Sequence, residues 1–150
     1  MHRTMFAAVL GLAFAGLSAH AAPLCDDLGF AGLLASCNRG ETIALTLASG
    51  QPLFAGGQPV ELQSGAYYEI EITSDGSAEL ALAGAEFFRS IWINEIVIND
   101  IEIRPMAVDS LEFDDEGTAT MSFVAIRPGS YALEIPGSTG ETQRVEFAIR

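Results

Sequence analysis

A regular succession of short strand-like runs limits the folds open to this chain more than any other feature. From residue 41 onward, apolar or alternating runs are broken by Gly, Asn, Asp or Pro about every eight to twelve residues. This spacing is typical of an all-β sandwich. The predicted strands cover about 42–48, 59–63, 66–74, 77–83, 90–98, 101–105, 108–113, 117–126, 129–135 and 142–149.

The run over 90–98 changes phase partway along. Its apolar residues occupy odd positions up to Ile93 and even positions from Ile96. Because side chains alternate between the two faces of a strand, an uninterrupted strand would expose half of them. The sequence therefore predicts a bulge near Asn94–Glu95 and a turn at Asn99–Asp100.

The stretch Glu112–Gly137 is predicted to form a β-hairpin. Thr118–Ile126 is rich in β-branched and aromatic residues, and Tyr131–Ile135 alternates apolar with small or polar ones. Between them, Pro128 fixes φ at the first central turn position and Gly129 tolerates positive φ at the second, which favours a type II turn. The apolar residues of the second strand would then share one core-facing side.

Two stretches carry a family resemblance. Phe123-Val-Ala-Ile-Arg-Pro-Gly-Ser-Tyr131 resembles the penultimate hairpin of cupredoxin-like domains. Glu69–Asn99 looks like the middle of the cupredoxin-like domains found in periplasmic iron- and copper-handling proteins. The resemblance implies an all-β, cupredoxin-like Greek-key β-sandwich.

The resemblance also implies that the type 1 copper ligands are missing. In blue-copper members, the strand after Pro-Gly-Thr-Tyr ends in the Cys ligand, a His and usually a Met follow, and an earlier strand supplies another His. The resemblance places Ile135 at the Cys position and Glu79–Leu80 at the early His position. No His or Met follows Gly137.

The first residues are predicted to direct export. Residues 1–21 combine a basic start, an apolar core and small residues before a cleavage site, which is typical of a signal peptide. We expect an N-terminal helical, disulfide-containing segment over 22–40 and the cupredoxin-like sandwich over 41–150. No apolar run reaches the length of a membrane span. The expected location is periplasmic or secreted.

The chain is strongly acidic. Its 20 acidic residues all follow residue 21, whereas one of its 7 basic residues, Arg3, precedes it, which leaves a net charge of −14 after that point. Nucleic acids and anionic membranes are therefore excluded as partners, because both require basic patches. The acidity favours solubility or, alternatively, attraction of cations or of a basic partner protein.

Both cysteines, Cys25 and Cys37, lie in the exported part, where oxidation is favoured. We expect one disulfide that closes a loop around a short helix and adds roughly 3 kcal/mol of stability. The alternative, a reactive thiol pair, lacks the Cys-x-x-Cys spacing.

Both histidines, His2 and His20, lie within the predicted signal peptide. The exported part therefore lacks His-based acid–base chemistry, His-activated nucleophiles and the usual zinc and copper sites. We predict no catalytic residue, no cofactor-binding residue and no enzymatic activity. The acidic run Asp109–Glu116 lacks calcium-loop spacing and is interpreted as a solvated strand end and turn.

Four residues are the candidate metal ligands: Glu79, Glu86, Glu134 and Met106. A plain ion pair with Arg89 is the alternative role for Glu86, and surface exposure is the alternative for Glu134. If metal binds, copper or iron is the expected ion, because the resembling domains handle these metals.

Trp92 alternates with Ile91 and Ile93, so it should face away from them. Beside Phe88 it would mark a contact surface for a partner, unless a loop or the N-terminal helix covers it.

The leading hypothesis is an exported, non-catalytic cupredoxin-like module that binds a periplasmic protein or a small ligand without a blue-copper site. The alternative is a periplasmic metal-handling protein that binds copper or iron through carboxylates and Met106.

Overall fold

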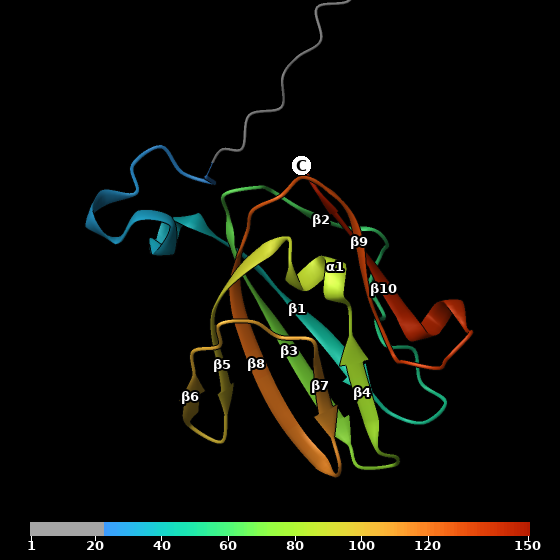
Figure 1. Ribbon diagram of the computed structural model, residues 1–150. Coiled ribbons are helices and arrows are strands. Elements are labelled where there is room, and N and C mark those ends of the chain that lie inside the picture. The colour runs from blue at the N-terminus through green and yellow to red at the C-terminus, as the bar shows by residue number, and fades with distance from the viewer. Residues whose placement is uncertain (1–22) are drawn as a thin grey trace, which may run out of the picture.

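The computed structural model describes residues 23–150. Figure 1 shows two sheets packed face to face, with the disulfide-closed N-terminal segment to one side. The predicted signal peptide, residues 1–21, lies outside the described residues.

Ten strands in the described chain form two sheets of five. The first sheet has the order β1 (Arg39–Leu47), β3 (Tyr67–Asp75), β8 (Glu116–Ala125), β5 (Ile91–Ile98) and β6 (Ile101–Ile103). The second has the order β2 (Val60–Leu62), β10 (Arg144–Ile149), β9 (Gly129–Glu134), β4 (Leu80–Ala83) and β7 (Ser110–Phe113). Each predicted strand is present, with ends shifted by a few residues.

Most neighbouring strands are antiparallel. The exceptions are β1 beside β3 and β2 beside β10, which are parallel. The β9–β4 contact is short, since only Ala83 and Glu134 pair. Strand β4 ends at Ala83, and the short helix α1 (Ala85–Phe88) begins after Gly84.

The core lies between the sheets and is centred on aromatic side chains. Phe87 of α1 is fully buried, with its ring centroid 4.4 Å from that of Phe147 in the second sheet and 5.7 Å from that of Phe123 in the first. Aromatic pairs at such distances add about 0.5–1.5 kcal/mol each beyond area burial. Helix α1 therefore fixes the separation of the sheets where β4 ends.

The predicted phase change in β5 is confirmed. Its pairing register with β8 shifts between Ile93 and Glu95, which marks a bulge. Asn99 and Asp100 have φ of 49° and 63°, as a type I′ turn requires, and they connect β5 to β6. The bulge lets the apolar residues on both sides of it face the core.

The predicted hairpin over Glu112–Gly137 is wrong. Strands β8 and β9 both form, but they belong to opposite sheets. The backbone N–H groups of Ile126 and Arg127 both donate to the carbonyl oxygen of Ser90, so the chain leaves the first sheet there. The segment from Arg127 to Gly129 is a corner between sheets, and β9 pairs with β10 instead of β8.

The N-terminal segment is a closed loop, as predicted. Cys25 and Cys37 form a disulfide with their Cα atoms 5.9 Å apart. In place of one helix the segment has two short 3₁₀ stretches, Gly29–Leu34, which is kinked at Gly32, and Ser36–Asn38. The side chain of Asn38 is fully buried and ties the loop to the sandwich, because it accepts from the Leu24 N–H at 2.8 Å and donates to the carbonyls of Leu33 and Gly65 at 2.8 and 2.9 Å.

Candidate functional site

The two positions that the resemblance assigns to copper ligands lie together. Ile135 directly follows β9, and Leu80, next to Glu79, begins β4. Both border one shallow depression of about 420 Å³, which we call the β9-end depression. Ile135 is only 7% exposed and belongs to the apolar core, and its backbone N–H donates to the Gln143 carbonyl at 3.0 Å. The Cys position is thus filled by packed hydrocarbon that cannot ligate a metal.

Three carboxylates meet beside this depression. Glu79, Glu112 and Asp114 each place an oxygen within 4.8 Å of the others, and all three are exposed. Antiparallel pairing of β4 with β7 brings them together, since Ala81 lies opposite Glu112. The hydrogen bond and negative charge of Glu79 raise the pKa of Glu112 above its usual 4.5. This acidic cluster (Glu79, Glu112 and Asp114) has donor oxygens suited to a hard cation.

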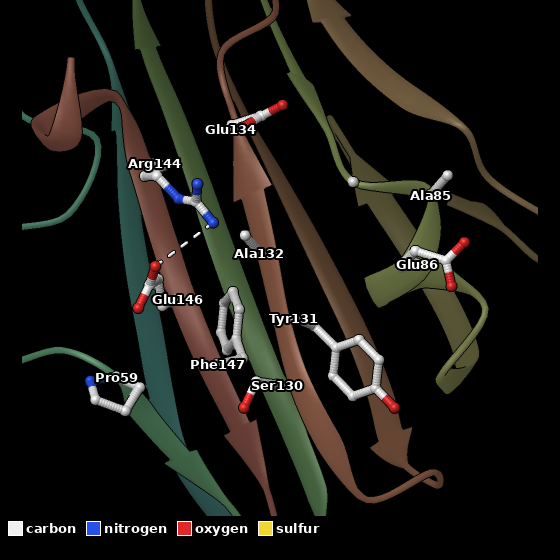
Figure 2. Close-up of a pocket in the computed structure, with 11 residues that line it drawn as sticks. Pro59, Ala85, Glu86, Ser130, Tyr131, Ala132, Glu134, Arg144, Glu146 and Phe147 are labelled. Carbon is white, nitrogen blue, oxygen red and sulfur yellow. Dashed lines mark ion pairs between the residues drawn. The ribbon is translucent and has the colours of Figure 1, made fainter. Parts of the chain in front are cut away.

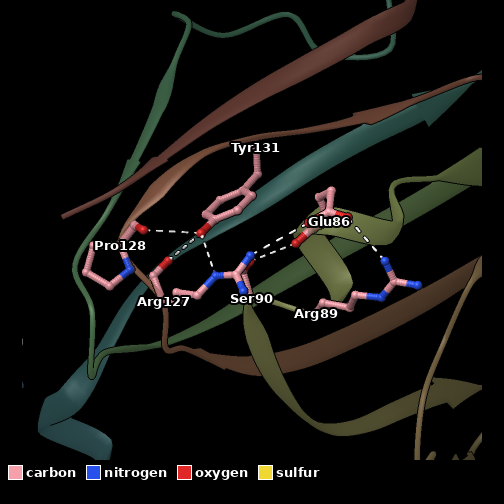
Figure 3. Close-up of polar contacts among 6 residues, drawn as sticks. All are labelled: Glu86, Arg89, Ser90, Arg127, Pro128 and Tyr131. Atoms are coloured by element: carbon pink, nitrogen blue, oxygen red, sulfur yellow. Dashed lines mark hydrogen bonds and ion pairs between the residues drawn. The ribbon is translucent and has the colours of Figure 1, made fainter.

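Glu86 is held by arginines. Figure 3 shows its carboxylate between two guanidinium groups, 3.1 Å from that of Arg89 and 3.7 Å from that of Arg127. All three side chains are well exposed, so solvent screens both pairs and each contributes little to stability. The ion-pair role foreseen for Glu86 with Arg89 is present in the structure.

Arg127 also contacts a tyrosine that pins the corner between β8 and β9. The Tyr131 hydroxyl donates to the carbonyl oxygens of Arg127 and Pro128, at 3.0 and 3.2 Å, and accepts from Arg127 Nε at 3.3 Å (Figure 3). The hydrogen bond from Arg127 lowers the pKa of Tyr131 below its usual 10. These contacts give the tyrosine a structural role at the corner.

Glu134 lies on the outer face of β9, opposite Ala83 of β4. Figure 2 shows it at one end of a cleft of about 480 Å³, with Glu86 across the opening. Arg144 is opposite Glu134 in the β9–β10 register but pairs with Glu146, at 3.5 Å. Glu134 and Glu86 thus line one cleft from different elements.

Met106 lies in the loop between β6 and β7 and is fully exposed. It borders a groove of about 710 Å³ between this loop, α1 and β5, which we call the β5 groove. Trp92, also on the groove, is 49% exposed, whereas Phe88 is buried. Of the two residues predicted to form a contact surface, Trp92 is therefore accessible to a partner, whereas the ring of Phe88 is covered.

The four candidate ligands do not form one site in the structure. Glu79 lies in the acidic cluster, Glu86 and Glu134 line the cleft of Figure 2, and Met106 borders the β5 groove. Sequence reasoning missed Glu112 and Asp114 as neighbours of Glu79. Two features could have indicated that they are neighbours: the acidic run that contains Glu112 and Asp114, and a pairing of the predicted strands near 77–83 and 108–113.

Comparison with solved structures identifies the fold. A multicopper oxidase matches 73% of this chain and 44% of its own length, with a TM-score of 0.53 and 7% identity. A multi-copper oxidase from Pseudomonas thermotolerans matches 72% of this chain and 30% of its own at 16% identity and a TM-score of 0.49. Auracyanin B matches 73% of this chain and 88% of its own at 9% identity and a TM-score of 0.41. This chain thus spans less than half the length of these oxidases.

The chain is a cupredoxin-like β-sandwich with a disulfide-closed N-terminal segment, as predicted. No protein-family model matches it, and no curated protein sequence matches it. Within residues 23–150, no helix is both long enough and apolar enough to cross a membrane.

Proposed function

We propose that this chain is an exported, non-catalytic cupredoxin-like module that binds a partner protein or a small ligand and has no blue-copper site. The observation that carries the proposal is the burial of Ile135 where the resemblance places the copper-ligating Cys. A blue-copper centre needs a thiolate and two imidazoles around one metal ion. Residues 23–150 contain no His, and their two cysteines are bonded to each other.

Binding is supported by the surface. Trp92 and Met106 expose apolar area around the β5 groove, and aromatic and Met side chains are enriched at protein interfaces. Export is supported by the predicted signal peptide and by the disulfide, which persists in oxidising compartments. The expected location is therefore periplasmic or secreted.

The acidic cluster favours a second candidate function, a periplasmic protein that handles copper or iron through carboxylates. Glu79, Glu112 and Asp114 are close enough to share one cation, which would relieve the repulsion that raises the pKa of Glu112. Glu86, Glu134 and Met106 lie elsewhere and would not join the same ion. This site would use oxygen donors alone.

Native mass spectrometry of the exported chain with Cu(I), Cu(II), Fe(III) and Zn(II) distinguishes the two functions. If the chain is a binding module without a metal site, each metal should give only weak adducts at several sites, and a chelator should remove all of them. The metal-handling function predicts one stoichiometric ion that is lost in Glu79→Gln and Glu112→Gln but kept in the matched control Glu141→Gln. Glu141 is also exposed but lies in the turn before β10.

A further inference from the structure

We infer that the β5 groove binds an extended segment of a partner protein, which adds to the free edge of β5 and alternates apolar with basic side chains. The inference rests on the proposed binding function and assigns its site and its partner chemistry. Three independent features of the groove support it: an unpaired strand edge, an apolar lining and an uncompensated acidic group.

The free edge is the first half of β5. On one side, β5 pairs with β8 along its length, whereas on the other side β6 pairs with it only over Ile96–Ile98. In the described part of the chain, no strand pairs with Ile91–Glu95 on that second side, and the loop after β6 makes no backbone hydrogen bond to it. Unpaired N–H and C=O groups along a strand edge are a template for a further strand.

The path of the chain after β6 leaves room for such a strand. Arg104 is held against the sheet by Glu95 at 3.1 Å and Glu102 at 3.2 Å, and the following residues then cross to β7 in the other sheet. The β5 groove lies between this crossing loop and β5. An added strand would lie about 4.8 Å from β5, in line with β6.

The lining of the groove matches an alternating segment. The large apolar side chains that line it are Phe88, Ile91, Trp92, Ile93, Met106 and Val108. Trp92 points to the opposite face of β5 from Ile91 and Ile93. One set of partner side chains would therefore enter the groove, and the other set would lie beside the Trp92 ring.

Charge favours basic side chains in the partner. Asp109 lines the groove and has no ion pair within residues 23–150, whereas Arg89 on the opposite rim is already paired with Glu86. A basic side chain in the partner would pair with Asp109 and with the excess of acidic residues on this chain. A second copy of the chain would bring the same excess, so the favoured partner is a different protein.

The test uses a short, capped peptide of alternating Lys and Val as the probe. Trp92 is the sole Trp of the chain, so its fluorescence reports on the groove directly. Binding should shift the Trp92 emission to shorter wavelength and reduce its quenching by acrylamide. Hydrogen exchange should show new protection of amides within 91–95, which side-chain contact alone would not produce.

Variants and control peptides locate the site. Met106→Ser should weaken binding roughly tenfold, as for a central interface residue, while Ile101→Ser, an equal change in polarity at an exposed site on β6, should leave it unchanged. Asp109→Asn should weaken binding about threefold and reduce its salt dependence, with Glu141→Gln as its control. A Glu–Val peptide and a backbone N-methylated Lys–Val peptide should not bind.

The inference is overturned if no Lys–Val binding occurs, if the N-methylated peptide binds equally well, or if the newly protected amides lie outside β5. These results would leave the proposed function standing, since that function fails only if the metal experiments reveal a stoichiometric or thiolate-bound ion. The two proposals are therefore tested separately.

Discussion

The β9-end depression and the β5 groove differ in how completely their residues are packed and hydrogen-bonded within the described chain. At the depression, Ile135 is buried, its backbone is hydrogen-bonded to Gln143, and its side chain completes the core. At the groove, half of a strand lacks a partner on one edge within the described chain, and Trp92 and Met106 are exposed.

This difference separates structural roles from binding roles. A buried aliphatic residue contributes stability and offers no donor atom to a ligand, whereas an unpaired edge with exposed apolar side chains contributes little stability and can be completed by a partner. In this chain, the position that resembles the copper-ligating Cys therefore belongs to the core, and the binding surface that we propose lies at the β5 groove.

The largest expected effect on stability is at Ile135, which fills the position of the copper-ligating Cys. Ile135→Ala should lower the free energy of unfolding by about 2–4 kcal/mol, because it leaves a cavity in the core. Glu134→Ala, one residue away on the exposed face, should change it by less than about 0.5 kcal/mol. Urea unfolding of both variants gives the comparison. If Glu134→Ala is the more damaging, the assignment of Ile135 to the core is refuted.

Breaking the disulfide should lower stability without changing the structure of the β9-end depression or of the β5 groove. Replacing Cys25 and Cys37 with Ser should reduce stability by roughly 3 kcal/mol through the unfolded chain, and the β-sheet circular dichroism should not change. Denatured, unreduced protein should show no titratable thiol. Two free thiols in oxidised material would contradict the bridge and return a reactive pair to consideration.

The Asn38 anchor should have a slightly smaller effect. Asn38→Ala removes three hydrogen bonds and leaves the Leu33 and Gly65 carbonyls without this donor, which should cost about 2 kcal/mol. Thermal unfolding measures the loss. Ser36→Ala, in the same turn, is the matched control and should be nearly neutral. An equal loss in both variants would show that the turn itself, and not the Asn38 side chain, anchors the loop.

The smallest expected effect concerns the acidic cluster. The raised pKa of Glu112 means that the folded protein holds this proton more tightly than the unfolded chain, so its contribution favours folding at low pH and is lost as pH rises through the folded-state pKa. Glu112→Gln should therefore raise the urea midpoint at neutral pH, with a gain that shrinks as pH falls through the folded-state pKa of Glu112 toward 4.5. A lower midpoint at neutral pH would contradict repulsion by Glu79.

Local patterns in the sequence predicted the strands well, but they did not specify distant partners. The phase change before Ile96 has one local remedy, so the bulge was predictable. The Pro128-Gly129 segment, in contrast, can form either a hairpin or a corner between sheets. Which of the two forms depends on hydrogen bonds to the Ser90 carbonyl, which is far away in sequence. The acidic cluster was missed for the same reason, since β4–β7 pairing brings Glu79 beside Glu112.

The most direct test of the central claim is the visible spectrum of the chain without residues 1–21, titrated with Cu(II). Blue-copper absorption requires a Cys thiolate bonded to Cu(II) with His partners. Because Ile135 occupies the Cys position and both cysteines are bridged, the oxidised protein should stay colourless at stoichiometric copper. An intense blue band would contradict the account.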